Sequence, residues 1–284
     1  MVKRLYSSNA WGYYQLGDNI KLPDIAGQII DIGFDGFDFL YGEDSFPKTD
    51  SGLNLSQITD LKQIVEGKGG VISAVVLVSF ELNNADNCIR QLEEGAILAN
   101  ALGTNRINLL PRKKGIVKSA AIKNLEHVWS KKGAEVLSSG LKVSAENHVS
   151  TDNEDSDEFL FRTSNDFLEI LSILDNQIHI KFDPAWLAMA GDDYLKAFEK
   201  CLPFIDLLDV KDYKDGRFVT PGTGIIYFNK LADIMKLNGK FFDIGVEVEE
   251  HHFYKPSVHD INKINFLHKS ALDFYKLIFD VKNN

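Results

Sequence analysis

The sequence predicts one (β/α)8 barrel over residues 1–284, and three observations support this fold class. Short apolar, β-branched runs alternate with longer amphipathic stretches, which is the order expected of βαβ units and a parallel sheet. Eight such runs occur along the chain, and eight parallel strands close a barrel of this kind. The length of 284 residues is close to the roughly 250 residues that are typical of the fold, and no Pro-, Gly- or Ser-rich linker divides the chain.

The predicted strands are short segments rich in Val, Ile, Leu and Phe. They are Arg4–Ala10, Gly36–Leu40, Val71–Phe80, Arg106–Leu110, Leu141–Ala145, Ile178–Phe182, Ile205–Val210 and Phe242–Val248. The predicted helices are Leu22–Ile32, Asn54–Gly67, Asn87–Leu102, Ala120–Ser139, Asn165–Leu174, Asp193–Cys201, Phe228–Leu237 and Phe266–Val281. An open, doubly wound sheet is disfavoured because no glycine-rich phosphate fingerprint follows the first strand.

Several residues mark where the predicted helices begin and end. Gly33 and Gly103 each follow an apolar-periodic stretch, as a glycine just beyond a helix does. Ser164 and Asp193 are predicted to cap the helices that follow them. The acidic, polar segment Ser150–Glu158 follows a strand and is predicted to be an exposed loop.

The composition and net charge of the chain disfavour some classes of binding partner. The formal net charge is −10, which disfavours nucleic acid and anionic membranes as partners. The two cysteines, Cys88 and Cys201, fit no metal-ligand spacing, and we expect free, buried thiols. No apolar run approaches the roughly 20 residues that cross a bilayer, and Met1–Tyr6 is not followed by an apolar signal segment. We therefore expect a cytoplasmic location.

Carboxylates lie at the carboxyl ends of the last four predicted strands. A barrel of this kind carries its functional residues at these ends of the strands. The carboxylates are Glu146, Asp183, Asp209 with Asp212, and Glu247 with Glu249. Any single one of them is more simply explained as a helix cap or a solvated loop charge. Their occurrence on four successive strands predicts a cation between them, because converging carboxylates otherwise repel one another. Oxygen ligands favour Mg²⁺ or Mn²⁺, and Zn²⁺ is possible where an imidazole joins them.

These residues also lie in motifs that resemble a known family. The motifs, in chain order, are Gly33–Asp38, Ala101–Gly103, Glu146–His148, Phe182–Pro184, Val210–Asp212 with Pro221–Gly224, and Phe242–Glu249. Each motif alone is weak, but their order and spacing resemble those of the sugar-phosphate isomerase/epimerase superfamily. This superfamily comprises xylose isomerase-like barrels and includes endonuclease-four-type DNA repair enzymes.

The resemblance implies one metal ion held by Glu, Asp, His and a closing Glu. These positions correspond to Glu146, Asp183, Asp209 and Glu249, with Glu247 as the alternative for the last. Asp209 stands where the family has His, and a further family His corresponds to Trp186. The departure at Asp209 makes the ligand set more anionic and favours Mg²⁺ or Mn²⁺ over Zn²⁺.

The resemblance also implies a reaction, in which two glutamates exchange a proton with the carbon next to a carbonyl. Glu146 and Glu249 take these catalytic roles. The candidate substrate-binding residues are His148, Trp186, Lys211 and Arg217. Lys211 could bind an oxyanion or pair with Asp209. Each of the four also has an ordinary explanation: a surface histidine, packing, an inward lysine that balances carboxylates, and a solvated loop arginine.

The leading hypothesis is therefore a metal-dependent isomerase or epimerase of a ketose sugar or sugar phosphate, and a homodimer or homotetramer is possible. The second is a non-catalytic barrel that binds a carbohydrate or a partner protein, which the changes at Asp209 and Trp186 favour. The third is a metal-dependent endonuclease, and the acidic composition with few histidines makes it the least favoured.

Overall fold

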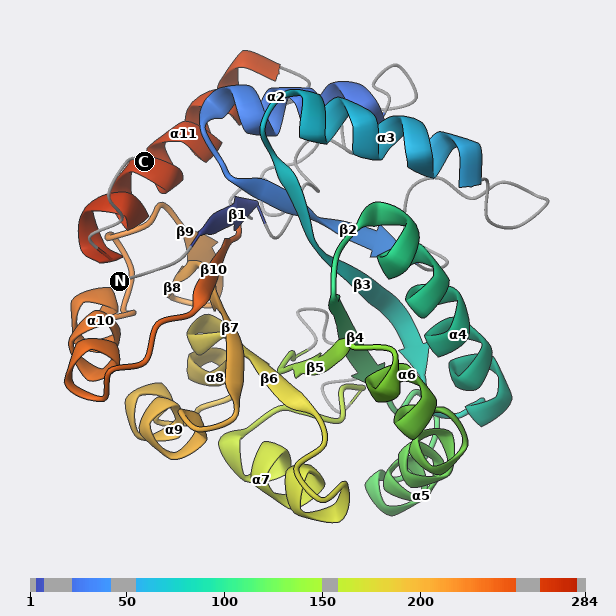
Figure 1. Cartoon of the computed structure of the whole chain (residues 1–284). Helices are drawn as coiled ribbons and strands as arrows, with labels where there is room; N and C mark the ends of the chain where they lie inside the picture. The colour runs from blue at the N-terminus through green and yellow to red at the C-terminus, as the bar shows by residue number, and fades with distance from the viewer. Residues whose placement is uncertain (1–3, 8–21, 42–54, 150–157, 249–260, 280–284) are drawn as a thin grey trace. The chain divides into compact units, whose positions relative to one another are not determined.

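The computed structural model describes residues 4–7, 22–41, 55–149, 158–248 and 261–279. Its main sheet is a closed barrel of parallel strands in the order β1-β10-β7-β6-β5-β4-β3-β2 (Figure 1). The strands are β1 (Leu5–Ser7), β2 (Gly36–Tyr41), β3 (Val71–Glu81), β4 (Arg106–Arg112), β5 (Lys142–Glu146), β6 (His179–Phe182), β7 (Ile205–Val210) and β10 (Asp243–Val246). This confirms the predicted (β/α)8 fold.

The chain divides into two compact units. The terminal unit comprises Met1–Asp38, Ser56–Ser73 and Leu207–Asn284, and the central unit comprises Phe39–Leu55 and Ala74–Asp206. The single domain over residues 1–284 stays a prediction.

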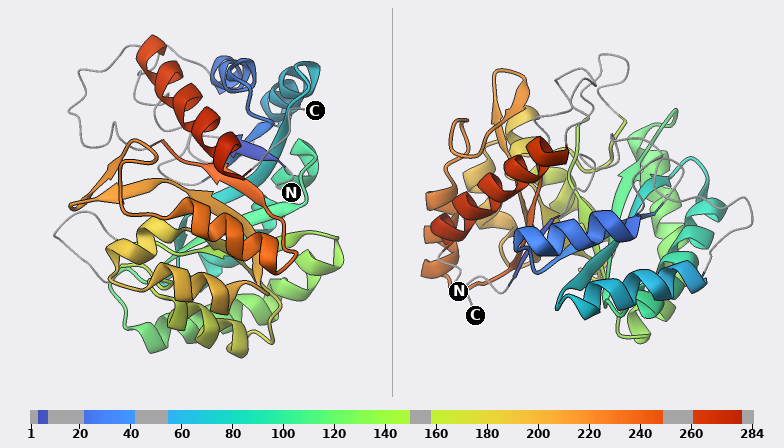
Figure 2. Two further views of the ribbon diagram at one scale, coloured as in Figure 1. Left: turned by 90° about the vertical axis from the view of Figure 1, so that its left-hand side faces the viewer. Right: turned by 90° about the horizontal axis from the view of Figure 1, so that it is seen from above.

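The described helices of the terminal unit are α2 (Leu22–Ile32), α3 (Leu55–Gly67), α10 (Phe228–Leu237) and α11 (Ile261–Phe279). Helix α11 lies against both α2 and α10 (Figure 2). The ring of Tyr275, which is fully buried, meets the ring of Phe228 edge-on at 5.0 Å between centroids. The aromatic residues that face inward from α10 and α11 therefore build part of the core of this unit.

In the central unit, strands β4, β5 and β6 pair in register, so that Ala145 has both Leu109 and Ile180 as neighbours. The helices of this unit are α4 (Ala85–Leu102), α5 (Lys118–Val128), α6 (Ala134–Ser138), α7 (Ser164–Ile173), α8 (Pro184–Met189) and α9 (Tyr194–Cys201). Both cysteines are free and buried, as expected, and burial raises the pKa of each thiol to about 12.

The predicted helix Ala120–Ser139 is interrupted. A π-helical turn, η1 (Trp129–Gly133), separates α5 from α6. A side chain on Gly133 would place its Cβ 2.6 Å from the indole of Trp129, so the glycine leaves room for the ring. The indole Nε1 donates to Gln177 Oε1 at 2.8 Å, and this contact holds the ring at the irregular turn.

Two short elements were not predicted from the sequence. They are helix α8 and the two-stranded antiparallel hairpin of β8 (Asp212–Lys214) and β9 (Arg217–Val219). Asp215 and Gly216 form the tip of this hairpin and both have positive φ, which is the conformation of tight hairpin turns.

The expected helix ends are mostly confirmed. Gly33 and Gly103 have positive φ angles of 107° and 75°, and Asp193 accepts a hydrogen bond from the Lys196 amide. The prediction of Ser164 as a cap is wrong. Thr163 is the N-cap residue of α7, because its side chain and that of Asp166 form a reciprocal capping box. The loop predicted at Ser150–Glu158 lies outside the described residues, apart from Glu158.

None of the helices that the structure describes combines the length and apolarity that crossing a bilayer requires.

Candidate active site

Glu146 is the last residue of β5, and its side chain is buried. It lies opposite Lys181 of β6 in the parallel register. The Lys181 ammonium donates to Glu146 Oε2 at 2.8 Å, and only 2% of the lysine side chain and 7% of the glutamate side chain are exposed. A buried carboxylate needs such a charged partner, because removal from water disfavours its ionised form.

Asn147 joins the ends of β5 and β6. Its Nδ2 donates to the Asp183 carbonyl at 2.8 Å, and its Oδ1 accepts from the Asp183 amide at 2.9 Å. The side-chain amide thus continues the backbone ladder for one residue beyond the paired strands. As a result, Glu146 and Asp183 stand at fixed positions on adjacent strand ends.

Asp183 has a structural role that the sequence did not reveal. It is the N-cap residue of α8, and its Oδ1 accepts from the amides of Ala185 and Trp186 at 2.7 and 3.1 Å. Pro184 occupies the first turn, where its missing amide hydrogen costs nothing. The carboxylate is fully buried, so its orientation is set by the helix that it begins.

His148 is packed between two aromatic rings. Its imidazole centroid lies 3.8 Å from that of Trp186 and 4.2 Å from that of Phe159. Phe159 is held in place by a bridge between its backbone and Arg112, and the Arg112 guanidinium lies 5.2 Å above its ring. His148 is partly exposed, whereas Trp186 is buried. Two of the predicted substrate-binding residues are therefore in direct contact.

A second lysine–glutamate pair lies where β7 and β10 end. Val210 is the register partner of Val246, which places Lys211 beside Glu247. The Lys211 ammonium donates to Glu247 Oε2, and both side chains are buried. Lys211 therefore balances a buried carboxylate, as the ordinary explanation of this residue predicts, and a pairing with Asp209 stays a prediction. Its ammonium also lies 4.7 Å above the Phe218 ring.

Asp212 organises the loop that contains the Pro221–Gly224 motif. Its Oδ2 accepts from the amides of Gly222 and Gly224 at 2.9 and 2.8 Å, and its Oδ1 accepts from those of Tyr213 and Ile226. Four backbone donors satisfy this buried carboxylate. The hydrogen bonds explain why Asp212 and the glycines of Pro221–Gly224 occur together: the carboxylate of Asp212 holds the loop in place. Asp212 therefore has a structural role that does not involve a metal ion.

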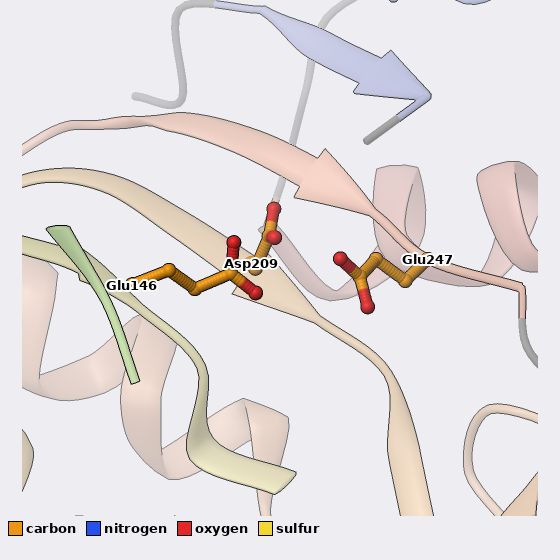
Figure 3. Close-up of side chains that lie close together, drawn as sticks. All are labelled: Glu146, Asp209 and Glu247. Atoms are coloured by element: carbon orange, nitrogen blue, oxygen red, sulfur yellow. The ribbon is translucent and has the colours of Figure 1, made fainter. Parts of the chain in front are cut away.

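Three buried carboxylates are close together: Glu146, Asp209 and Glu247. Each offers one oxygen, and these oxygens lie within 4.8 Å of one another. Figure 3 shows the three side chains pointing toward one another. We call this set the acidic triad. It contains the alternative closing residue Glu247, and Asp183 is not one of its members.

The other predicted site residues are placed differently. Arg217 is exposed on β9 of the hairpin. Glu249 lies outside the described residues, so its catalytic and metal-binding roles stay predictions. Lys181 and Asn147 were not identified from the sequence. Lys181 sits two residues before Asp183 on a strand, so the alternation of side chains would have placed both on one face.

The fold and the acidic triad define a class: a (β/α)8 barrel with carboxylates at the carboxyl ends of its strands. A family model described as "Xylose isomerase-like TIM barrel" matches residues 27–276. The chain therefore belongs to the xylose isomerase-like TIM barrel family, which confirms the resemblance found in the sequence. A search of curated proteins finds no match.

Solved structures of similar fold include a sugar epimerase, a sugar phosphate isomerase/epimerase and a zinc-binding protein. D-Psicose 3-epimerase from Clostridium cellulolyticum H10 has 13% identity and a TM-score of 0.76, covering 98% of this chain and 99% of that chain. An IOLI protein with a bound zinc atom has 16% identity and a TM-score of 0.73, covering 98% of both chains. A sugar phosphate isomerase/epimerase from Parabacteroides distasonis has 17% identity and a TM-score of 0.66, covering 98% of this chain and 95% of that chain. At these identities the likeness establishes the fold alone.

Proposed function

We propose that the protein is an enzyme, a divalent-metal-dependent isomerase or epimerase of a ketose sugar or sugar phosphate. The observation that carries this proposal is the acidic triad of Glu146, Asp209 and Glu247, whose oxygens lie within 4.8 Å of one another. The similarity in fold to a D-psicose 3-epimerase and to a sugar phosphate isomerase/epimerase supports the choice of substrate class.

The residues of the acidic triad suit a divalent cation. All three are buried carboxylates, and hard oxygen ligands of this kind favour Mg²⁺ or Mn²⁺. The three carboxylates that the described part of the chain brings together favour Mg²⁺ or Mn²⁺ over Zn²⁺. Asp183 and Glu249 remain proposed additional ligands. A bound ion supplies Lewis-acid polarisation of the substrate carbonyl, which stabilises the negative charge that develops next to it.

The chain's own residues move the proton. Glu146 accepts the proton from the carbon next to the carbonyl, and its carboxylate is oriented for this by the hydrogen bond from Lys181. A glutamate of the closing strand returns a proton to the same or to the neighbouring carbon. Glu247 is suited to this second role because it is buried and fixed by Lys211, and Glu249, to which the resemblance gives the role, stays a candidate for it. His148 and Trp186 are proposed to contact the substrate, as are Lys211 and Arg217.

Hydrogen exchange tests the function without knowledge of the product. A panel of ketoses and ketose phosphates is incubated in D2O with Mn²⁺ and followed by NMR. Glu146→Gln should slow incorporation of deuterium at the α carbon by about 100-fold or more, the usual contribution of a general base. Full-rate exchange in this variant would remove Glu146 from the catalytic role.

Glu135→Gln is the matched control for that experiment. Glu135 lies on α6 in the same unit, and its side chain is 71% exposed. Its loss should leave the exchange rate unchanged. Circular dichroism of both variants shows whether the fold is retained.

A second function is a barrel that binds carbohydrate without converting it. Trp186 favours it, because a buried indole stands where the family has an imidazole, and its ring contacts His148. This reading predicts that a ketose raises the melting temperature while no α-deuterium appears. The same NMR panel, combined with thermal melts, therefore separates the two functions.

A further inference from the structure

Glu146 and Glu247 of the acidic triad each have a lysine ammonium in contact. The Lys181 ammonium is 2.8 Å from Glu146 Oε2 in the central unit. The Lys211 ammonium forms the corresponding pair with Glu247 in the terminal unit. The two pairs are built alike, since in each a lysine and a glutamate meet across adjacent parallel strands.

Both lysines are held deep inside the protein. Each lysine side chain is 2% exposed and each glutamate side chain is 7% exposed. Lys211 is further fixed by the face of the Phe218 ring, 4.7 Å from its ammonium. The pairs are therefore poorly screened by solvent, in contrast to ion pairs on the surface.

The charges of these five side chains are three negative and two positive. The lysines offset most of the repulsion between the carboxylates without any metal. A divalent cation that binds Glu146 or Glu247 must share the carboxylate with an ammonium, and it meets the positive charges of both lysines.

We propose that Lys181 and Lys211 are resident cations of the acidic triad that weaken its binding of divalent metal. This inference rests on the metal site of the proposed function. It means that metal affinity is set by the two lysines as much as by the three carboxylates, and that removing one lysine charge strengthens metal binding.

Titration of the full-length protein with MnCl2 tests the proposal through affinity, without an activity assay. Lys181→Gln keeps a hydrogen-bond donor near Glu146 and removes the charge. We expect it to bind Mn²⁺ at least tenfold more tightly than the unsubstituted protein in isothermal titration calorimetry. Lys211→Gln should strengthen binding in the same direction, and it provides an independent test if the first variant does not fold.

Lys142→Gln is the matched control. Lys142 is the first residue of β5, its side chain is 47% exposed, and it pairs with Asp206 at 3.2 Å. Its loss should change the dissociation constant less than twofold. A comparable gain in this variant would mean that overall charge is responsible, and this would overturn the proposal.

The remaining outcomes distinguish the proposed effect of the lysines from the proposed metal site itself. Measurable Mn²⁺ binding by the unsubstituted protein, with no gain in folded Lys181→Gln and Lys211→Gln, overturns this inference and leaves the metal site standing. Mn²⁺ binding only after a lysine is removed supports the inference and contradicts a metal-dependent function of the natural chain. No binding by any of these proteins at millimolar Mn²⁺ overturns both.

Discussion

Among the residues at the strand ends, Asp183 has one role in the structure and another that is predicted from the sequence. The sequence predicted it as a metal ligand, and the structure shows it as the N-cap of α8. The two roles are compatible in principle, because one carboxylate oxygen can cap a helix while the other binds a cation. Substitutions that separate capping from charge distinguish them.

We predict different effects for Asp183→Asn and Asp183→Ala. Asparagine retains a capping oxygen, so the alanine variant should be less stable than the asparagine variant by about 1 kcal/mol in urea unfolding. If Asp183 is also a ligand, both variants should bind Mn²⁺ more weakly. Unchanged Mn²⁺ affinity in Asp183→Asn would assign the residue to the helix alone.

Asp193 provides the matched pair of control variants. It caps α9 through the Lys196 amide, is exposed, and is predicted to have no part in the metal site. As at Asp183, the alanine variant Asp193→Ala should be less stable than Asp193→Asn. Both variants should bind Mn²⁺ as tightly as the unsubstituted protein does.

At the scale of elements, the loop after β8 and β9 is held by one carboxylate and two glycines. Asp212 accepts from the amides of Gly222 and Gly224. A Cβ on Gly224 would lie 2.1 Å from Asp212 Oδ1 and 2.6 Å from the Tyr213 carbonyl oxygen. The motif is thus explained by close packing of the loop on the carboxylate.

We predict that Gly224→Ala destabilises the protein by about 1–3 kcal/mol, the usual cost of forcing atoms into a filled space. Urea unfolding followed by circular dichroism measures this change. Gly67→Ala is the control, because nothing lies within 4 Å of a Cβ at Gly67, which ends α3. Equal stability of Gly224→Ala and the unsubstituted protein would show that the loop can rearrange at no cost.

At the scale of the whole molecule, stability depends on a buried histidine of α11. His268 is fully buried, and its ring meets that of Phe34 edge-on at 6.1 Å between centroids. Burial lowers its pKa from 6.5 to about 3. The unfolded chain therefore binds a proton at pH values where the folded protein does not, so stability falls as the pH drops below about 6.5.

We predict that His268→Leu reduces this loss of stability in acid. Between pH 7 and pH 4.5 the histidine should account for roughly 2–3 kcal/mol of the decrease, at about 1.4 kcal/mol per pH unit below its unfolded pKa. Urea unfolding at both pH values gives the difference. His127→Gln is the control, since His127 is exposed in the last turn of α5. If His268→Leu and the unsubstituted protein lose the same free energy of unfolding between pH 7 and pH 4.5, His268 is not the cause of the acid sensitivity.

Local sequence patterns were enough to predict the barrel and the carboxylates at its strand ends. Strand runs such as Val71–Phe80 are almost continuously apolar, because strands of a parallel barrel are covered on both faces, and this signal is local. Glu146 and Asp209 were identified for a related reason: the chain leaves each strand at the same edge of the sheet. The alternative of Glu247 for the closing residue was also open from the sequence.

The partners of these residues could be identified only in the folded protein. Nothing local in the sequence indicates that Lys181 contacts Glu146, 35 positions away, or that Asn147 bonds the backbone of Asp183. The π-helical turn at Trp129 likewise depends on a contact with Gln177. Local preferences decide where strands and helices form, whereas the register between distant strands decides which charges meet, and that register exists only once the sheet has formed.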